Sequence, residues 1–158
     1  MPVDDRFVYR APIWMRSPVV QTSLCRSRIR RWGRNPMLAA SREEILVTSA
    51  GVRLQGYWSP IDKHLQQGIA ILLPGWEGSA DSTYMVCTGR TLFKAGYSVY
   101  RLNYRDHGHT HHLNEGLFHG ALLGEVAEAV GQVAARAGKG PVFVIGFSLG
   151  GNFALRLA

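Results

Sequence analysis

Cysteine is scarce in this sequence. Cys25 and Cys87 are the only two among 158 residues, and they do not form a CxxC pair. Two cysteines cannot build the disulfide framework of a small secreted domain. The opening residues also lack the basic and apolar regions of a secretory signal peptide. We therefore expect the protein to work in a reducing cytoplasm.

Long apolar runs are absent as well. No stretch approaches the roughly 20 apolar residues that cross a bilayer, so we expect no transmembrane segment. Internal repeats and low-complexity tracts are also lacking. The composition, with 46% hydrophobic and 18% charged residues, is that of a chain that buries a core. It excludes intrinsic disorder for most of the length.

Acidic residues are nearly missing from the first quarter of the chain. Residues 1–42 hold nine arginines against two aspartates, whereas residues 43–158 hold nine basic and nine acidic side chains. The formal net charge of +7 therefore belongs to the first 42 residues. Such a charge can mark a nucleic-acid or anionic-lipid patch, but few aromatic residues alternate with the arginines. We expect a basic, irregular and solvated segment whose Phe7 and Trp14 pack against the body, and no nucleic-acid partner.

From residue 43 onward the pattern becomes regular. Two alternating segments that flank Ser49-Ala50-Gly51 predict a β-hairpin. Three short apolar runs are typical of strands buried on both faces, and three further segments predict helices, the second with Glu125 and Glu128 on its solvent side. This order favours an α/β fold with a mostly parallel sheet covered by helices. The expected strands are 45–48, 52–58, 69–73, 98–102 and 142–145, and the expected helices are 81–95, 122–137 and 152–158.

The last predicted strand runs into Gly146-Phe147-Ser148-Leu149-Gly150, which fits the G-x-S-x-G pattern of a nucleophile elbow. A serine between a strand and a helix occupies a strained turn, and glycines two positions away avoid collisions there. The following helix directs backbone N–H groups at a developing oxyanion. The bare pattern arises by chance in roughly one sequence of this composition in eight, so the flanking strand and helix give it its weight. Otherwise, Ser148 would simply cap a helix in an unrelated sheet.

A second glycine-rich loop, Pro74-Gly75-Trp76-Glu77-Gly78, follows the first parallel strand. An ester-hydrolysing fold takes its other oxyanion donor from the loop at this place. We expect the backbone N–H of Trp76 to be that donor. An ordinary Pro-Gly turn is the alternative.

These motifs resemble the α/β-hydrolase superfamily, and more narrowly its YheT-like esterase branch. The resemblance implies hydrolysis of a carboxylic ester, from a small-molecule or lipid-like substrate, through an acyl-serine intermediate and without a cofactor or metal. It implies Ser148 as the nucleophile, the backbone N–H groups of Trp76 and Leu149 as the oxyanion hole, and Gly146 and Gly150 as the elbow glycines. It rests on Pro12-x-Trp14 with Gln21-Thr22, and on residues 72–79, 103–108 and 146–152.

Two departures from the family pattern matter. Proline stands at position 74, where the family usually has histidine, so a backbone N–H and a side-chain donor are lost. The catalytic acid and histidine follow the nucleophile in this family, yet only ten residues follow Ser148, with Asn152 and Arg156 their only polar side chains. We therefore expect residues 43–158 to be the N-terminal portion of an α/β-hydrolase domain that lacks its C-terminal strands, in a truncated and inactive chain. A non-catalytic half-domain that needs a partner chain is the alternative.

Histidines gather after the second parallel strand, in His107-Gly-His109-Thr-His111-His112. The spacing is close to the H-x-H-x-D-H loop of metallo-β-lactamase-type hydrolases, in which alternate imidazoles bind zinc, but His111 stands in place of the aspartate. A metal-dependent hydrolase is thus a lesser alternative, and a polar loop at the edge of the site is the simpler interpretation. An upstream histidine could serve Ser148 as a base only within hydrogen-bond reach of its Oγ.

Overall fold

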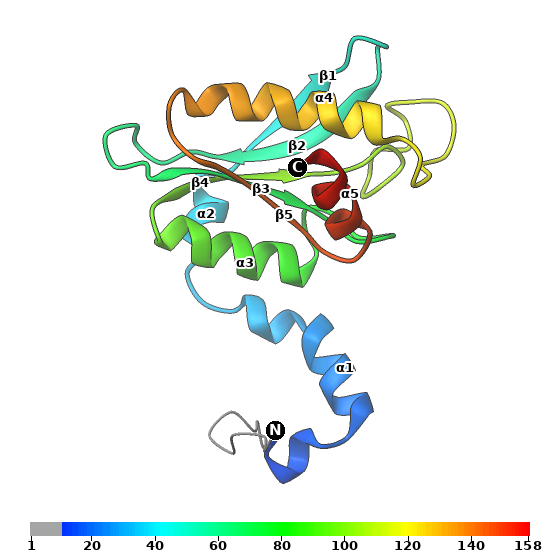
Figure 1. Ribbon diagram of the computed structural model, residues 1–158. Coiled ribbons are helices and arrows are strands. Elements are labelled where there is room, and N and C mark those ends of the chain that lie inside the picture. Colours follow the sequence, from blue (N-terminus) through cyan, green and yellow to red (C-terminus); the bar gives the residue numbers. More distant parts are fainter. Residues whose placement is uncertain (1–10) are drawn as a thin grey trace, which may run out of the picture.

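The computed structural model describes residues 11–158 and has a five-stranded sheet between two layers of helices (Figure 1). The main elements of residues 43–158 are confirmed, although the last helix begins at Leu149 and the second ends in a short 3-10 turn. The helices are η2 (Ile13–Met15), α1 (Pro18–Arg26), η3 (Arg28–Arg31), α2 (Pro36–Ala39), α3 (Thr83–Lys94), α4 (Leu123–Ala134), η4 (Ala135–Ala137) and α5 (Leu149–Leu157), and the strands are β1 (Arg42–Val47), β2 (Arg53–Ser59), β3 (Gly68–Leu73), β4 (Tyr97–Leu102) and β5 (Val142–Gly146).

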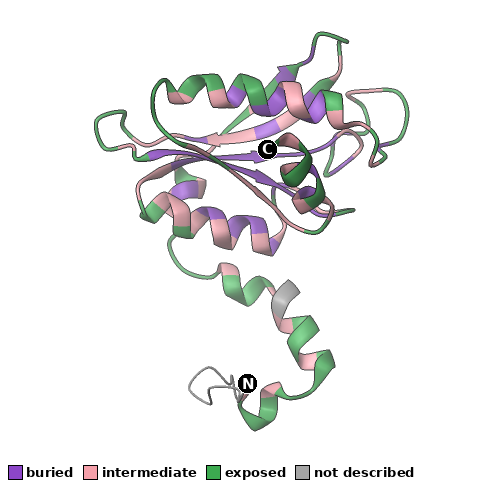
Figure 2. Ribbon diagram, in the orientation of Figure 1, coloured by how far each residue is buried: buried purple, intermediate pink, exposed green. Residues whose placement is uncertain are grey.

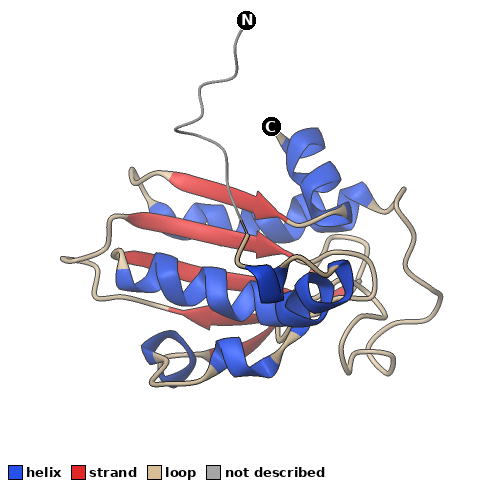
Figure 3. Cartoon of the chain, turned by 90° about the horizontal axis from the view of Figure 1, so that it is seen from below, coloured by secondary structure: helices blue, strands red, loops and turns tan. Residues whose placement is uncertain are grey.

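The strands lie side by side in one sheet (Figure 3). Their order is β1-β2-β4-β3-β5. β1 and β2 form the expected antiparallel hairpin, and β2 also pairs antiparallel with β4. β3 pairs in parallel with both β4 and β5. The sheet is therefore mixed, with the expected antiparallel hairpin beside the three parallel strands β4, β3 and β5. All six residues of β3 are buried, because the central strand is covered on both faces.

Helices cover both faces of the sheet through two apolar cores. On one face, Val126 of α4 and Phe153 of α5 share a core with Ile71. On the other face, Met85 of α3 shares a core with Leu72. Adjacent residues of β3 point in opposite directions, which is why one strand supplies both cores. This packing fixes the carboxyl ends of β3 and β5, where the two glycine-rich loops begin.

The N-terminal segment is more regular than the sequence predicts. In the part of the chain that the structure describes, four short helical elements, η2, α1, η3 and α2, precede the first strand. Pro18 and Pro36 are the first residues of α1 and α2, where a fixed φ favours a helix and the missing N–H costs nothing. The Asn35 side chain also accepts a hydrogen bond from the N–H of Leu38, which caps α2. Proline therefore starts helices here instead of breaking them.

The expected packing of Trp14 against the body is wrong, since this side chain is 65% exposed. Phe7 lies outside the described residues. Backbone contacts hold the segment instead: Arg90 of α3 donates hydrogen bonds to the carbonyl oxygens of Arg30 and Trp32, both at 3.1 Å. The apolar anchor is Met37, which is fully buried against α3. Within residues 11–158, no helix combines the length and the apolar character needed to cross a bilayer.

Candidate active site

Ser148 lies in the turn between β5 and α5 with φ 52° and ψ −113°, a conformation rare for any residue but glycine. Its side chain is exposed and makes no capping hydrogen bond to α5, so it does not act as a simple helix cap. A conformation of this kind costs about 1–3 kcal/mol and persists only where the surrounding structure enforces it. The serine is thus held in a strained turn at the sheet edge, as a nucleophile elbow requires.

The glycines on either side of Ser148 leave no room for a side chain. A Cβ atom at Gly146 would lie 2.0 Å from the carbonyl oxygen of Gly150. A Cβ atom at Gly150 would lie 2.4 Å from the carbonyl oxygen of Leu73, at the end of β3. Backbone atoms of a central strand cannot retreat as a flexible side chain can. Glycine at both positions therefore allows the elbow to pass close to β3.

The Pro74–Gly78 loop lies beside the elbow. A Cβ atom at Gly75 would lie 3.4 Å from the Cβ of Ser148, so the two glycine-rich segments are in contact. Two tyrosines fix the loop: the Tyr84 hydroxyl accepts from the N–H of Gly75 at 3.0 Å, and the Tyr104 hydroxyl donates to the carbonyl oxygen of Pro74 at 3.1 Å. Burial raises the pKa of Tyr104, so its hydroxyl stays protonated and remains a donor.

The two expected oxyanion donors lie on these adjoining segments. Leu149 is the first residue of α5, and its N–H is among those that have no acceptor within the helix. Trp76 directly follows Gly75. Its ring is 58% exposed and lies edge-on to the ring of His107, with 6.3 Å between centroids. The structure thus brings Ser148, both elbow glycines and the Trp76 loop to one place at the carboxyl ends of β3 and β5.

The histidines of the loop after β4 do not converge. His107 is buried with its ring against Tyr104, and its Nδ1 lies 2.9 Å from the carbonyl oxygen of Arg105. His111, by contrast, pairs with Asp106 at the surface. In the part of the chain that the structure describes, no three His, Cys, Asp or Glu side chains are grouped so as to hold a metal ion. This geometry gives no support to the metal-dependent alternative.

Glu125 is a residue whose role the sequence does not reveal. Helical periodicity places it on the solvent side, but it is buried and accepts a 2.7 Å hydrogen bond from Arg105. Arg105 also donates to the carbonyl oxygen of Glu115 at 2.9 Å. The pair therefore ties the long loop after β4 to α4. Periodicity could not find it, because the partner lies in a loop that has no period.

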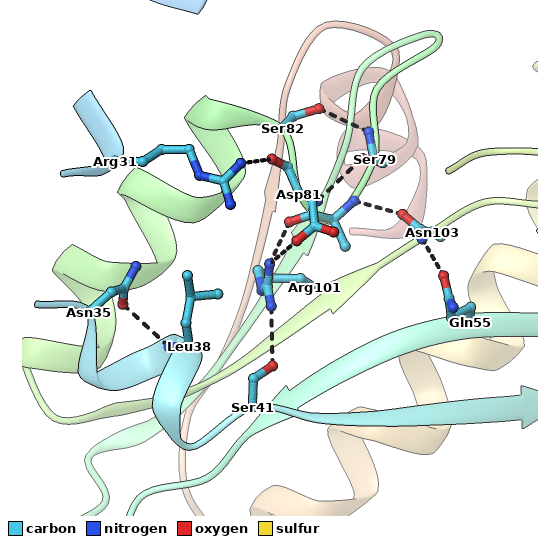
Figure 4. A network of polar contacts seen from close by, with 11 residues as sticks. Arg31, Asn35, Leu38, Ser41, Gln55, Ser79, Asp81, Ser82, Arg101 and Asn103 are labelled. Atoms are coloured by element: carbon cyan, nitrogen blue, oxygen red, sulfur yellow. Dashed lines mark hydrogen bonds and ion pairs between the residues drawn. The ribbon is translucent and has the colours of Figure 1, made fainter. Parts of the chain in front are cut away.

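A polar network holds the chain that follows the Pro74–Gly78 loop (Figure 4). Arg101 of β4 is 1% exposed and donates to the carbonyl oxygen of Ala80 at 2.6 Å and to the Asp81 carboxylate at 3.3 Å. Burial lowers the pKa of Arg101, and the Asp81 carboxylate opposes this. Asn103 accepts from the N–H of Ala80 at 2.6 Å and donates to Gln55 at 2.7 Å. Arg101 and Asn103, at the end of β4 and directly after it, thus hold the residues that follow the Pro74–Gly78 loop.

A polar cleft of about 970 Å³ adjoins the same loop. Trp76 and Glu77 line it on the loop side, and Arg28, Arg31 and Trp32 line it from the N-terminal segment. Ser148 is not part of its lining. The Trp76 loop is therefore shared between the elbow and this neighbouring cleft.

A serine in a left-handed turn between a parallel strand and a helix, beside a glycine-rich loop that follows the neighbouring strand β3, is the arrangement of the α/β-hydrolase fold. A family model described as alpha/beta hydrolase fold matches residues 71–158. The chain belongs to the alpha/beta hydrolase fold family.

Solved structures of the same fold include esterases and serine hydrolases. The esterase Pf2001 from Pyrococcus furiosus is 25% identical, with a TM-score of 0.63 over 79% of this chain and 49% of that protein. XC6422 from Xanthomonas campestris, described as an a/b serine hydrolase without lid, is 22% identical, with a TM-score of 0.61 over 75% of this chain and 55% of that protein. The chain thus spans about half the length of these proteins. No curated protein matches the sequence.

Proposed function

We propose that the protein is a serine hydrolase that acts on carboxylic esters through an acyl-serine intermediate on Ser148. The observation that carries the proposal is the left-handed backbone of Ser148, held between two glycines that have no room for a Cβ atom. The likeness to a Pyrococcus furiosus esterase supports the same class of substrate.

The proposed reaction is an acyl transfer in two steps. The Oγ of Ser148 attacks the ester carbonyl carbon while its proton passes to a base. The backbone N–H groups of Trp76 and Leu149 stabilise the resulting oxyanion, the bond to the alcohol breaks, and the alcohol leaves with a proton. Water then attacks the acyl-serine and releases the carboxylic acid.

We further propose that these 158 residues do not turn over esters at an enzyme's rate by themselves. In this fold the acid and the histidine that activate the serine follow it in the chain. No Asp, Glu or His follows Ser148 in the sequence.

Chemical rescue with imidazole tests both parts of the proposal. The purified chain is incubated with p-nitrophenyl acetate, with and without imidazole as a diffusible base, and acetylated serines are identified by peptide mass spectrometry. We expect no hydrolysis above a Ser148→Ala variant without imidazole, and imidazole-dependent acetylation at Ser148. Turnover that depends on Ser148 without imidazole would contradict the proposed inactivity. Acetylation of Ser79 and Ser82 at the same rate as Ser148 would contradict the proposed nucleophile.

A second candidate is a non-catalytic half-domain that pairs with another chain along β5. It is favoured by the position of β5 at one of the two edges of the described sheet and by the 47% exposure of Phe143 on it. A chain that stays monomeric by light scattering, with no second protein present, would argue against this candidate.

We also propose the YheT-like branch of the family and a cytoplasmic location. The Asn103–Gly108 motif supports the branch, since Asn103 holds the loop beside Ser148 through the N–H of Ala80. The free thiol of Cys87 supports a reducing compartment. Cell fractionation tests the location, and recovery from a secreted fraction would contradict it.

A further inference from the structure

Residues 11–34, the arm, extend away from the two helical layers (Figure 1). The arm contains six arginines and no acidic residue. Asp81 lies close to it, but that carboxylate pairs with the buried Arg101. The positive charge of the arm is therefore not neutralised by residues of its own.

Most of the arm is exposed (Figure 2), and its exposed residues include large apolar ones. Isolated exposed apolar residues are ordinary, but several close together mark a surface that contacts another apolar phase. The arm carries Ile13, Trp14, Val19, Ile29 and Trp32 at 81%, 65%, 73%, 66% and 79% exposure.

The contacts that attach the arm to the body do not use these exposed apolar side chains. The carbonyl oxygens of Arg30 and Trp32 accept from Arg90, and that of Arg30 also accepts from the thiol of Cys87 at 3.4 Å. Arg31 donates to the carbonyl oxygen of Asp81 at 3.2 Å. Apart from Arg31, these contacts use backbone groups of the arm. Residues 30–32 of the arm are thus held against α3 and Asp81 without the use of the exposed apolar side chains.

We propose that the arm docks on the surface of a bilayer that contains anionic phospholipids. Arginine side chains are attracted to the negative surface, and tryptophan prefers the boundary between headgroups and acyl chains. The aliphatic Ile13, Val19 and Ile29 gain by entering that boundary. A nucleic acid would bind arginine through its phosphates and tryptophan through base stacking, but it offers no favourable contact to these aliphatic side chains. The mixture therefore favours a lipid surface.

Docking of the arm would bring the candidate active site to the membrane. Arg28, Arg31 and Trp32 line the polar cleft together with Trp76, whose loop lies beside Ser148. A lipid-like ester would then be presented where the cleft opens. The proposed docking does not depend on the chemistry of Ser148, and a Ser148→Ala chain is expected to bind vesicles equally well.

Vesicle co-sedimentation tests the proposal with the whole 158-residue chain. Phosphatidylcholine vesicles are compared with vesicles of phosphatidylcholine and phosphatidylserine, and a run without vesicles corrects for self-association. We expect binding to the anionic vesicles that weakens with salt. Neutralising the exposed arginines together (Arg28→Gln, Arg30→Gln and Arg34→Gln) should weaken it about 100-fold, at about 1 kcal/mol for each cation near the surface.

The matched control neutralises three exposed cations of the body, with Lys63→Gln, Lys94→Gln and Lys139→Gln. We expect this variant to bind nearly as well as the original chain. The double change Trp14→Ala and Trp32→Ala should also weaken binding, whereas Leu65→Ala, at a side chain 72% exposed on the body, should not.

Three results would overturn the proposal. One is equal binding to neutral and anionic vesicles, and another is equal loss from the arm and the body triple variants. The third is a competition result: a DNA or RNA duplex displaces the chain from vesicles, and the Trp14→Ala and Trp32→Ala changes do not weaken binding of the chain to that duplex. That last result would assign the arm to nucleic acid.

Discussion

At the scale of single residues, the geometry of the elbow depends on the absence of a Cβ atom at Gly146 and Gly150. We predict that Gly146→Ala destabilises the fold by more than about 3 kcal/mol, because its Cβ would lie 2.0 Å from the backbone oxygen of Gly150. Denaturant unfolding followed by circular dichroism measures this loss. A loss below about 1 kcal/mol would mean that the turn can open without cost.

Gly131→Ala is the matched control for that prediction. Gly131 lies within α4, and a Cβ atom there would meet nothing within 4 Å. Alanine is a better helix former than glycine by about 1 kcal/mol, so this change should stabilise the fold slightly. Opposite signs for one chemical change would show that backbone crowding, rather than the added methyl group, determines the effect.

Asn103, which directly follows β4, holds Ala80, two residues after the Pro74–Gly78 loop. Asn103→Ala removes the acceptor of the buried N–H of Ala80 and the donor to Gln55. An unpaired buried N–H costs about 1–3 kcal/mol, so we predict a loss of stability in that range. Thermal unfolding measures it, with the exposed Asn152→Ala as the control that should leave stability nearly unchanged. Equal effects of the two changes would mean that the network contributes nothing to stability.

At the scale of elements, one carboxylate joins the β1–β2 turn to α4. Glu128 accepts hydrogen bonds from the N–H of Ser49 at 2.6 Å and from its hydroxyl at 2.8 Å. These two bonds favour the ionised form and lower the pKa of Glu128. A carboxyl group whose pKa is lower in the folded state stabilises the fold above its unfolded pKa, and this contribution is lost as pH falls through the folded value.

We therefore predict that Glu128→Gln lowers the free energy of unfolding near pH 7 and that the difference from the original chain disappears in acid. Carbon-detected NMR titration should give a pKa for Glu128 below 4.5, the ordinary value for this group. Ser49→Ala removes only the hydroxyl donor and keeps the backbone N–H, so it should raise the pKa of Glu128 part of the way back to its ordinary value. A difference between Glu128→Gln and the original chain that persists at low pH would contradict the assignment.

The sequence predicts the elements of the sheet well because their signals are local. The apolar run at 69–73 and the helical pattern at 122–137 correspond to β3 and to α4 with its 3-10 extension. The sequence does not predict the N-terminal helices, because a proline that begins a helix cannot be distinguished by sequence alone from a proline that interrupts one. The strand pairing is mixed because the hairpin adds two antiparallel pairings, which no single segment reveals.

The candidate site also has a part that the sequence predicts and a part that it does not. Ser148 and its two glycines form a local motif that can be read from five residues. The contacts that hold the loop beside it, from Tyr104 to Pro74 and from Asn103 to Ala80, join residues more than 20 positions apart. Only the three-dimensional structure brings such pairs together, so sequence reasoning finds the motif but not its support.

At the scale of the whole molecule, charge and packing divide the chain into two parts. Residues 43–158 form a body with balanced charge, and the basic arm adds exposed apolar side chains to an excess of arginine. The arm contacts the body mainly at α3, and its arginines reach the cleft beside the Trp76 loop. Binding by the arm and chemistry at Ser148 can therefore be tested separately.

The outer edge of β5 leads to a prediction about the molecule in solution. β5 pairs only with β3 in the described sheet, so its other edge presents unpaired backbone groups, and its Phe143 is 47% exposed. An apolar strand with an open edge is a template for pairing with another chain. We predict that the isolated 158-residue chain associates with itself, with a mass above 17.5 kDa by light scattering that grows with concentration.

Phe143→Lys should shift that association toward the monomer, because a charge on an edge strand opposes a second strand. Leu155→Lys is the matched control, since Leu155 is 83% exposed on α5 and gives the same change of charge away from the edge. Equal effects of the two lysines would mean that net charge, rather than the edge of β5, controls association. If the original chain stays monomeric at every concentration, the edge of β5 does not pair with a second chain. That result would also remove the main support for a non-catalytic half-domain that pairs along β5.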